Sequence, residues 1–487
     1  MLRRLALAPE HCRLRWILLL GLAVRVILAP LTSWDFDTPG FVQAGISTLY
    51  TGSPYTSSLW SNPPLAPFLA SPLLGVPAWF LGPQNLVVAV SAIAPVTAQT
   101  GVNATYLPVP AALLAWKLLF ILADAGVALL LYAAARQGTF GVALRPNVIA
   151  AAWMLNPLVI WASAVHGEID SLAVLFVLAG LLALVGKHWT SAGLFLALAV
   201  FTKAYPIVLI PLALVVLWMA PRDLLHRSRT RMIDLGRWAG GFLVGSVAFL
   251  AFIPESFRLL DAKLANPEYG GLSVLAVFNG ASPRGSGWYA AFSSNLSYAA
   301  LALDLFRGLA VAGVVCGTVL VALWLRQEPD ASEARRLRWI VLAAIWSVVG
   351  VLIADSVPEP ENLLAVIPLA LLALPATRWR APALAVALLS AAGLLLYLAY
   401  LTPFAMFYPL AHLLGNAQIL WVNRVVIGYV HTPLLQGTLW LGAGLLGGGC
   451  LLYLWARSAV ELIPRGWLLK LAGGSERHGP TAPDTQV

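Results

Sequence analysis

The sequence has few charged residues for its length. Only 10% of its 487 residues are Asp, Glu, Lys or Arg, whereas 60% are hydrophobic and the mean hydropathy is +0.83. A soluble chain carries about a quarter charged residues, so this composition cannot cover a water-facing globule. The shortage of charge excludes an ordinary soluble protein and indicates an integral membrane protein.

Cysteine is scarce as well. The three cysteines, Cys12, Cys316 and Cys450, are an odd number without the spacing of a metal site. The sequence therefore predicts neither a disulfide framework nor a zinc site. No small-residue cleavage site follows the apolar stretch 15–33, so we expect this stretch to be a retained first helix.

An internal repeat of fixed period is also missing, and so is a polar stretch long enough for a soluble catalytic domain. The first absence disfavours a transporter built from inverted repeats. The second places any chemistry in the loops and helix ends on one face of the membrane. We expect one membrane domain, 1–472, followed by a disordered cytoplasmic tail, 473–487.

Long apolar runs are abundant, and many approach the ~20 residues that a bilayer crossing needs. Twelve runs are visible, and the segment 63–100, which is apolar but rich in proline, adds two crossings or none. The predicted fold is therefore an all-α polytopic membrane protein with 12 to 14 transmembrane helices. The twelve runs are 15–33, 110–135, 147–165, 169–186, 190–202, 204–220, 237–254, 304–325, 339–356, 362–376, 382–402 and 434–456.

The net charge of +9 comes from short clusters of Lys and Arg between the apolar runs. Short cytoplasmic loops keep such residues, so the pattern indicates topology rather than nucleic-acid binding. It predicts that both termini are cytoplasmic. The loops 34–108, 255–303 and 403–432 then lie on the outer face.

Acidic residues gather at the predicted outer ends of the first helices. Asp35 and Asp37 follow the first apolar run. Carboxylates beside a bilayer are costly unless they are solvated or used, and one of these could deprotonate a sugar hydroxyl. They could also hold Mg²⁺ or Mn²⁺ together with a phosphate. A solvated loop with a helix cap explains the same pattern without any chemistry.

A second acidic turn, His166-Gly167-Glu168-Ile169-Asp170, opens the run 169–186 on the same face. Glu168 and Asp170 together exceed what helix capping requires. The turn 355–362, which includes Glu361, is a third acidic outer segment, and Asn295 lies in the outer loop 255–303. From the residues alone, a functional role and helix capping explain Glu168 and Asp170 equally well.

Two lysines lie within or beside apolar segments. Lys203 separates two half-length apolar runs, and a cation there needs an anionic partner, either a lipid phosphate or a buried carboxylate. Lys117 and Asp124 lie seven residues apart on one predicted helix, and so on one face. The plain alternative for them is an intramembrane ion pair with no catalytic task.

Taken in order, these residues resemble the first mannosyltransferase of glycosylphosphatidylinositol (GPI) anchor assembly and its prokaryotic relatives, in the GT-C class of glycosyltransferases. The resemblance covers 33–215 well and the rest poorly. It departs from the family pattern at 359–362 and in the longer insertion 66–108. The segments that carry it are Asp35-Phe36-Asp37, Gly52-Ser53-Pro54-Tyr55, Lys117-Leu118-Leu119-Phe120, Asn156-Pro157-Leu158, Glu168-Ile169-Asp170-Ser171 and Lys203-Ala204-Tyr205-Pro206.

The resemblance implies an inverting glycosyltransferase of the plasma membrane, with a GT-C-like bundle and catalytic extracytoplasmic loops. Its donor would be a polyprenyl-phosphate mannose, and its acceptor a glycan or a lipid-linked saccharide. Asp35 or Asp37 would act as the base, and both are the candidate metal ligands. Lys203 and Lys117 would bind the donor phosphate, and the substrate contacts would be Tyr55, His166, Glu168, Asp170, Tyr205, Asn295 and Glu361.

Two other functions fit the sequence less well. A transporter or flippase for a lipid-linked saccharide predicts functional charges through the depth of the membrane. A structural subunit predicts no dependence on Asp35 or Asp37. The enzyme hypothesis requires that Asp35, Asp37 and Lys203 face one shared site.

Overall fold

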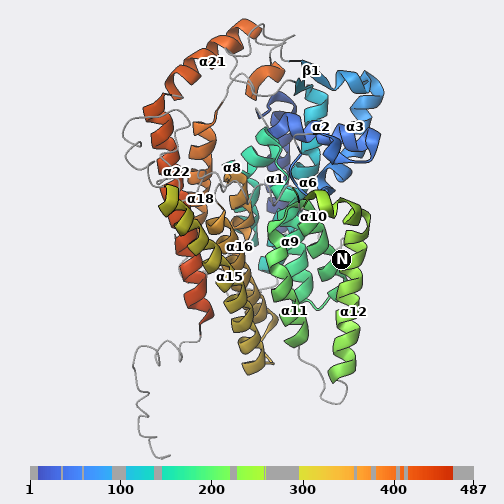
Figure 1. Ribbon diagram of the computed structural model, residues 1–487, viewed down its shortest axis with the longest axis vertical. Helices are drawn as coiled ribbons and strands as arrows, with labels where there is room; N and C mark the ends of the chain where they lie inside the picture. Colours follow the sequence, from blue (N-terminus) through green and yellow to red (C-terminus); the bar gives the residue numbers. More distant parts are fainter. Residues whose placement is uncertain are drawn as a thin grey trace, which may run out of the picture.

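A computed structural model of the chain describes residues 9–34, 37–57, 60–89, 106–136, 145–219, 227–256, 258, 296–355, 359–373, 380–401, 406–410, 415–430 and 432–463. Within them the structure is almost wholly helical, and its one sheet is a two-stranded antiparallel ribbon. The long helices run along the long axis of the molecule (Figure 1). The all-α polytopic fold predicted from the apolar runs is confirmed.

The first half of the described chain contains short helices and the ribbon between longer helices. The strands pair with Val87 opposite Pro108 and Ala89 opposite Tyr106. The elements are α1 (Pro9–Leu31), α2 (Asp37–Thr51), η2 (Pro54–Thr56), α3 (Leu65–Leu81), η3 (Pro83–Asn85), β1 (Val87–Ala89), β2 (Tyr106–Pro108), α6 (Pro110–Arg136), α7 (Pro146–Met154), α8 (Pro157–Ile160), η4 (Trp161–His166), α9 (Asp170–Val185), α10 (Trp189–Thr202), η5 (Tyr205–Leu209) and α11 (Ile210–Met219).

The described part of the second half contains four helices that are long and apolar enough to cross a membrane. They are joined by short turns and by segments outside the described residues. The elements are α12 (Arg227–Ser246), η7 (Val247–Phe252), α15 (Leu296–Gln327), α16 (Glu333–Ala354), η9 (Pro360–Ala365), α17 (Ile367–Ala373), α18 (Arg380–Ala399), η11 (Tyr408–Leu410), α21 (Asn416–Val430) and α22 (Pro433–Leu462).

Fewer full-length spans are present than the 12 to 14 predicted. Among the described residues, six helices are long and apolar enough to cross a membrane, or seven if the bent pair Pro146–Met154 and Pro157–His166 is one span. Seven further apolar helices have only 10 to 17 residues. The difference arises because several predicted runs form helices too short to count as full spans. Run 147–165 is broken at Asn156, and the runs on either side of Lys203, predicted as two crossings, form helices of 10 to 17 residues. Segment 63–100 contains one such helix, α3, and no full span within its described part.

Close helix packing builds the membrane core. A side chain at Gly193 of α10 would lie 2.0 Å from the carbonyl oxygen of Trp238 in α12, and one at Gly241 would lie 2.0 Å from that of Thr190. Small residues at such crossings let membrane helices approach closely. The large hydrophobic core contains buried residues from the helices α6 through α11, α15 through α18, and α22. A smaller core lies between α2, α3 and α6.

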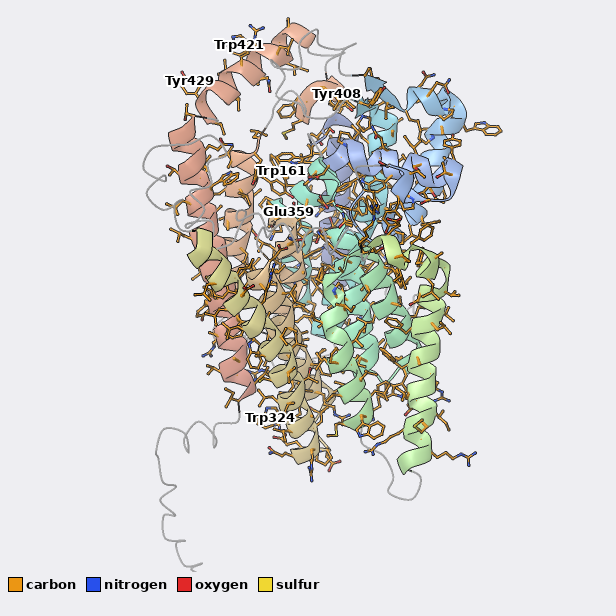
Figure 2. The ribbon with its side chains drawn as sticks, in the orientation of Figure 1. Trp161, Trp324, Glu359, Tyr408, Trp421 and Tyr429 are labelled. Carbon is orange, nitrogen blue, oxygen red and sulfur yellow. The ribbon has the colours of Figure 1, made fainter. Side chains whose placement is uncertain are left out.

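Figure 2 places Trp324 near the lower end of the molecule, and Trp161 and Glu359 in the upper half. Trp324 Nε1 donates to the Leu462 carbonyl oxygen at 2.7 Å, and the neighbouring Glu461 of α22 pairs with Arg338 of α16 at 2.9 Å. Glu359 is one of the carboxyl groups of the candidate site.

Candidate functional site

The loop after α1 presents Asp37 at the first position of α2, where a carboxylate is favourable beside the helix N-terminus. Its side chain is 35% exposed. The next residue fixes the loop, because the Thr38 hydroxyl accepts a hydrogen bond from the Trp34 N–H at 2.9 Å and donates one to the His166 carbonyl at 2.5 Å. Asp37 is therefore held against the His166 turn with one side open.

The His166 turn follows a helix break that is fixed by capping residues. The Asn156 side chain caps Leu158 N–H at 2.9 Å and Pro157 stands at the first helical position, so a new helix starts there, bent by 45° from α7. This helix ends in the π-helical turn η4, which Gly167 terminates with φ +85°. Such π-turns are frequent at functional sites.

His166 is the centre of the site. Its Nε2 lies 3.0 Å from Asp37 Oδ2 and 3.3 Å from Glu168 Oε1. Its Nδ1 lies 3.1 Å from the Tyr397 hydroxyl, which donates to Glu361 Oε2 at 3.1 Å. These contacts form a continuous chain from a half-exposed carboxylate to a buried one.

Aromatic rings surround the imidazole and hold it in place. The Trp34 ring centroid lies 5.3 Å from that of His166 and 5.2 Å from that of Tyr397. Trp161 stacks on Tyr397 at 5.7 Å. The imidazole therefore has one orientation, with Nε2 toward the carboxylates.

Lys203 lies where α10 ends and an extended residue leads into η5. Its ammonium donates to Asp170 Oδ2 at 2.5 Å and to Asn362 Oδ1 at 2.9 Å, and its side chain is 16% exposed. Burial on its own lowers the pKa of Lys203, but the carboxylates of Asp170, Glu168 and Glu361 outweigh burial, and the net pKa is raised. The ammonium therefore stays protonated at neutral pH.

Carboxyl groups outnumber cations in this cluster. Five of them (Asp37, Glu168, Asp170, Glu359 and Glu361) act on one another or on Lys203. Burial raises the pKa of Glu168 well above its ordinary value, and Asp37, Asp170 and Glu359 raise it further against the effect of Lys203. Three of the five, Glu168, Asp170 and Glu361, are buried. Buried carboxyl groups in such number are unfavourable by themselves, which is typical of a site that binds a cation or does chemistry.

The geometry suits a divalent cation. Ligand atoms of Asp37, His166 and Glu168 lie within 4.8 Å of one another, and so do those of Glu168, Asp170 and Glu361. The buried Oδ1 of Asp170 has no hydrogen-bond partner among the described residues. Carboxylates with one imidazole fit Mn²⁺, and carboxylates alone fit Mg²⁺ or Mn²⁺. The metal ligands expected from sequence were Asp35 and Asp37, and Asp35 lies outside the described residues.

Other sequence-predicted residues are placed differently. Tyr205 is within electrostatic range of Asp170 and Lys203, at the edge of the cluster. Tyr55 instead binds the Ser256 hydroxyl at 2.8 Å and the Asn62 carbonyl at 3.1 Å. Asn295 lies outside the described residues.

Lys117 has partners other than the phosphate predicted for it. Its buried ammonium donates to three backbone carbonyls, those of Ala29, Thr32 and Val165. Three N–H donors and three acceptors leave it no hydrogen bond for a ligand. We therefore remove Lys117 from the donor-phosphate site.

The ion pair considered for Asp124 exists, but with another cation. Arg25 Nε lies 2.8 Å from Asp124 Oδ2, and both side chains are fully buried. Arg25 was not singled out from the sequence, although an arginine inside the first apolar run is the signal that would have found it. Tyr397 was also missed, because an isolated polar residue among apolar ones carries no pattern. Asn362 lies in the acidic turn 355–362 that the sequence singled out, but no role was predicted for it.

Part of the chain matches a known protein family. The family model described as PIG-U, GPI transamidase subunit PIG-U, matches residues 29–269, slightly less than half of the chain. That family consists of multi-pass membrane proteins related to GT-C-like proteins. No curated protein matches the chain.

The matched region contains Asp37, His166, Glu168, Asp170 and Lys203, but ends before Glu361 and Tyr397. The family model and the sequence motifs thus point to two different proteins of the GPI-anchor machinery. The model is that of a transamidase subunit, whereas the motifs resemble the first mannosyltransferase. The match supports a multi-pass membrane protein similar to the PIG-U family. The mannosyltransferase assignment remains a proposal.

Proposed function

We propose that the chain is a membrane glycosyltransferase that moves a sugar, mannose by the sequence resemblance, from a polyprenyl-phosphate donor to a lipid-linked or glycan acceptor. The reaction would take place on the non-cytoplasmic face of the plasma membrane. The observation that carries this proposal is the clustering of two contact groups. His166 contacts Asp37 and Glu168, Lys203 pairs with Asp170, and carboxylate oxygens of Glu168 and Asp170 lie within 4.8 Å of each other.

Asp37 suits the role of general base. It is the most exposed member of the His166-centred group, and His166 Nε2 at 3.0 Å orients its carboxylate. The acceptor O–H would give its proton to Asp37 while its oxygen attacks the sugar C1. The bond between C1 and the phosphate oxygen breaks, so the configuration at C1 is inverted and polyprenyl phosphate leaves.

Lys203 suits the departing phosphate. An ammonium group has three N–H donors, and Asp170 and Asn362 take two of them among the described residues. The third can donate to a phosphate oxygen as negative charge develops on it. Stabilising such charge is often the largest single contribution to catalysis.

A divalent cation would fit the same acid-rich cluster. Asp37, His166 and Glu168, or Glu168, Asp170 and Glu361, would hold it. When bound, it would balance the buried carboxylates and neutralise charge on the phosphate. Asp37 and Lys203 keep the roles given above.

A label-transfer experiment tests the proposal. Purified protein in nanodiscs is given polyprenyl-phosphate [³H]mannose and a panel of glycolipid acceptors. Wild type is compared with Asp35→Ala, Asp37→Asn and Lys203→Met, with Asp304→Asn as the matched control, because Asp304 is an exposed carboxylate of α15 away from the cluster. Transfer by wild type and Asp304→Asn, but not by Asp37→Asn or Lys203→Met, supports the proposal, and equal transfer by all variants contradicts the site.

A second candidate function comes from the family match itself. The PIG-U family is described as a subunit of GPI transamidase, so the chain could be a non-catalytic membrane subunit. This alternative predicts no label transfer by any variant. It also predicts that cells whose chromosomal copy carries Asp37→Asn behave like wild-type cells.

A further inference from the structure

The ammonium group of Lys117 connects two segments that are far apart in the sequence. It lies 3.2 Å from the carbonyl oxygen of Ala29, 2.6 Å from that of Thr32 and 2.8 Å from that of Val165. Ala29 lies in the last turn of α1, Thr32 directly follows that helix, and Val165 lies in the last turn of η4. One side chain of α6 therefore binds the C-terminal ends of two other helices.

Both segments lead directly into the candidate site. Asp37 follows Thr32 by five residues, and His166 follows Val165 immediately. The free carbonyls at a helix C-terminus carry partial negative charge, which favours a cation there. The ammonium thus replaces the solvent that such carbonyls would otherwise need inside the protein.

The neighbouring residues of α6 and η4 are adapted to this contact. Trp116, beside Lys117 on α6, donates from Nε1 to the Gly167 carbonyl at 2.8 Å. Gly167 adopts φ +85°, and a Cβ there would lie 3.0 Å from Lys117 Cγ. A side chain at position 167 would thus crowd both its own backbone and the lysine stem, so α6 and the turn fit only with glycine.

From this geometry we infer that Lys117 is a positioning residue. Its ammonium fixes the end of α1 to the turn before His166 and so sets the 3.0 Å contact between Asp37 and His166. It does not touch the substrate. The inference rests on the proposed function only for its effect on sugar transfer, because the effect on structure is independent of any activity.

Lys117→Met tests the inference with two measurements. Methionine keeps the unbranched shape but leaves the three carbonyls without their donor. Amide hydrogen exchange of the full chain in nanodiscs is followed in peptides covering 29–34 and 162–169. We expect exchange there to become about tenfold faster, the equivalent of one lost net hydrogen bond. For sugar transfer we expect kcat to fall about 100-fold with little change in KM for the donor, since small displacements of reacting groups are costly.

Leu131→Ala is the matched control, because Leu131 is also a fully buried residue of α6 but has no part in the carbonyl contacts. It weakens packing in general, and it should leave exchange in the two segments and kcat unchanged. Equal changes in exchange and kcat for both variants would mean that Lys117 contributes only general packing, and would overturn the inference.

Two other outcomes also count against it. Unchanged exchange in Lys117→Met means that the ammonium does not hold the segments. A raised KM for the polyprenyl-phosphate donor with kcat retained means that Lys117 binds the phosphate after all. If wild type transfers no sugar, the proposed function fails, while the exchange measurement still decides the positioning role.

Discussion

Two buried ion pairs in this molecule look alike but differ in their surroundings. Arg25 and Asp124 lie 2.8 Å apart with both side chains fully buried, and Arg25 also donates to the carbonyl oxygens of Gly21 and Met154. Lys203 and Asp170 lie 2.5 Å apart, but Lys203 is 16% exposed and further carboxylates surround the pair. The first pair is closed and balanced, whereas the second is open on one side and carries excess negative charge.

From this difference we assign a structural role to the Arg25–Asp124 pair and a functional role to the Lys203–Asp170 pair. The enclosed pair has one cation for one carboxylate, ties α1 to α6, and neither of its side chains is exposed. An unbalanced pair that reaches the surface is unfavourable for folding, so we attribute it to a ligand or a reaction. The following experiments break or sharpen this contrast, starting with the largest expected effect.

Asp37→Asn should reduce sugar transfer on the order of 100- to 10,000-fold, the usual contribution of a general base. The amide keeps the size of the side chain but cannot accept the proton of the acceptor hydroxyl. Single-turnover label transfer measures the effect, with the midpoint of thermal unfolding as the control for folding. Transfer within threefold of wild type would remove Asp37 from the mechanism.

The two ion pairs should respond differently when each is replaced by apolar residues. Arg25→Met alone should lower the free energy of unfolding by about 3–5 kcal/mol, because it leaves Asp124 buried without its cation. The double variant Arg25→Met/Asp124→Leu should recover most of this loss and transfer sugar normally. Lys203→Met/Asp170→Leu should fold equally well but lose transfer by about 100-fold.

Denaturant unfolding and label transfer on all three variants check this contrast. Equal activity in the two double variants would abolish the distinction between scaffold and site.

Divalent cations should stabilise the wild-type protein through the acid cluster. Mn²⁺ at 100 times its Kd should add about 2.7 kcal/mol to the free energy of unfolding. Glu168→Gln should remove most of the effect, since Glu168 belongs to both candidate ligand sets. Thermal unfolding with Mn²⁺ or with EDTA measures this directly. Identical shifts in wild type and Glu168→Gln would place the cation elsewhere.

Without a metal ion, in EDTA, Glu168→Gln should change the free energy of unfolding less than in the experiments above, and the change should depend on pH. The pKa of Glu168 is raised in the folded protein, so its neutral form is favoured there. The protonated Glu168 side chain contributes its full share of the folding stability below the pKa of the unfolded chain, about 4.3. This contribution is lost as the pH rises toward the pKa of the folded protein. The variant should therefore gain stability over wild type as the pH rises from 5 to 8. A constant difference across this range would show that Glu168 is not perturbed.

The sequence was most informative where several residues carried one signal. Apolar runs predicted the all-α membrane fold, and the order of Asp37, Glu168, Asp170 and Lys203 pointed to residues that the structure brings into one cluster. The helix ends on which these residues lie are local features, so a linear pattern is enough to find them.

Single residues acting over long sequence separations could not be predicted in this way. Tyr397 reaches His166 across 231 positions, and Lys117 reaches the Ala29 carbonyl across 88. The number of full spans also differed, because breaks such as that after Leu155 depend on capping at Asn156 rather than on hydropathy. Hydropathy finds apolar runs but does not determine where a helix within a run must end.

The most direct test of the shared site is a cryo-EM structure of the protein in nanodiscs with polyprenyl-phosphate mannose bound to Asp37→Asn. We expect a phosphate oxygen within hydrogen-bond distance of the Lys203 ammonium and the sugar C1 facing residue 37. Density for the phosphate on another face of the molecule, or beside Lys117, would contradict the proposed arrangement.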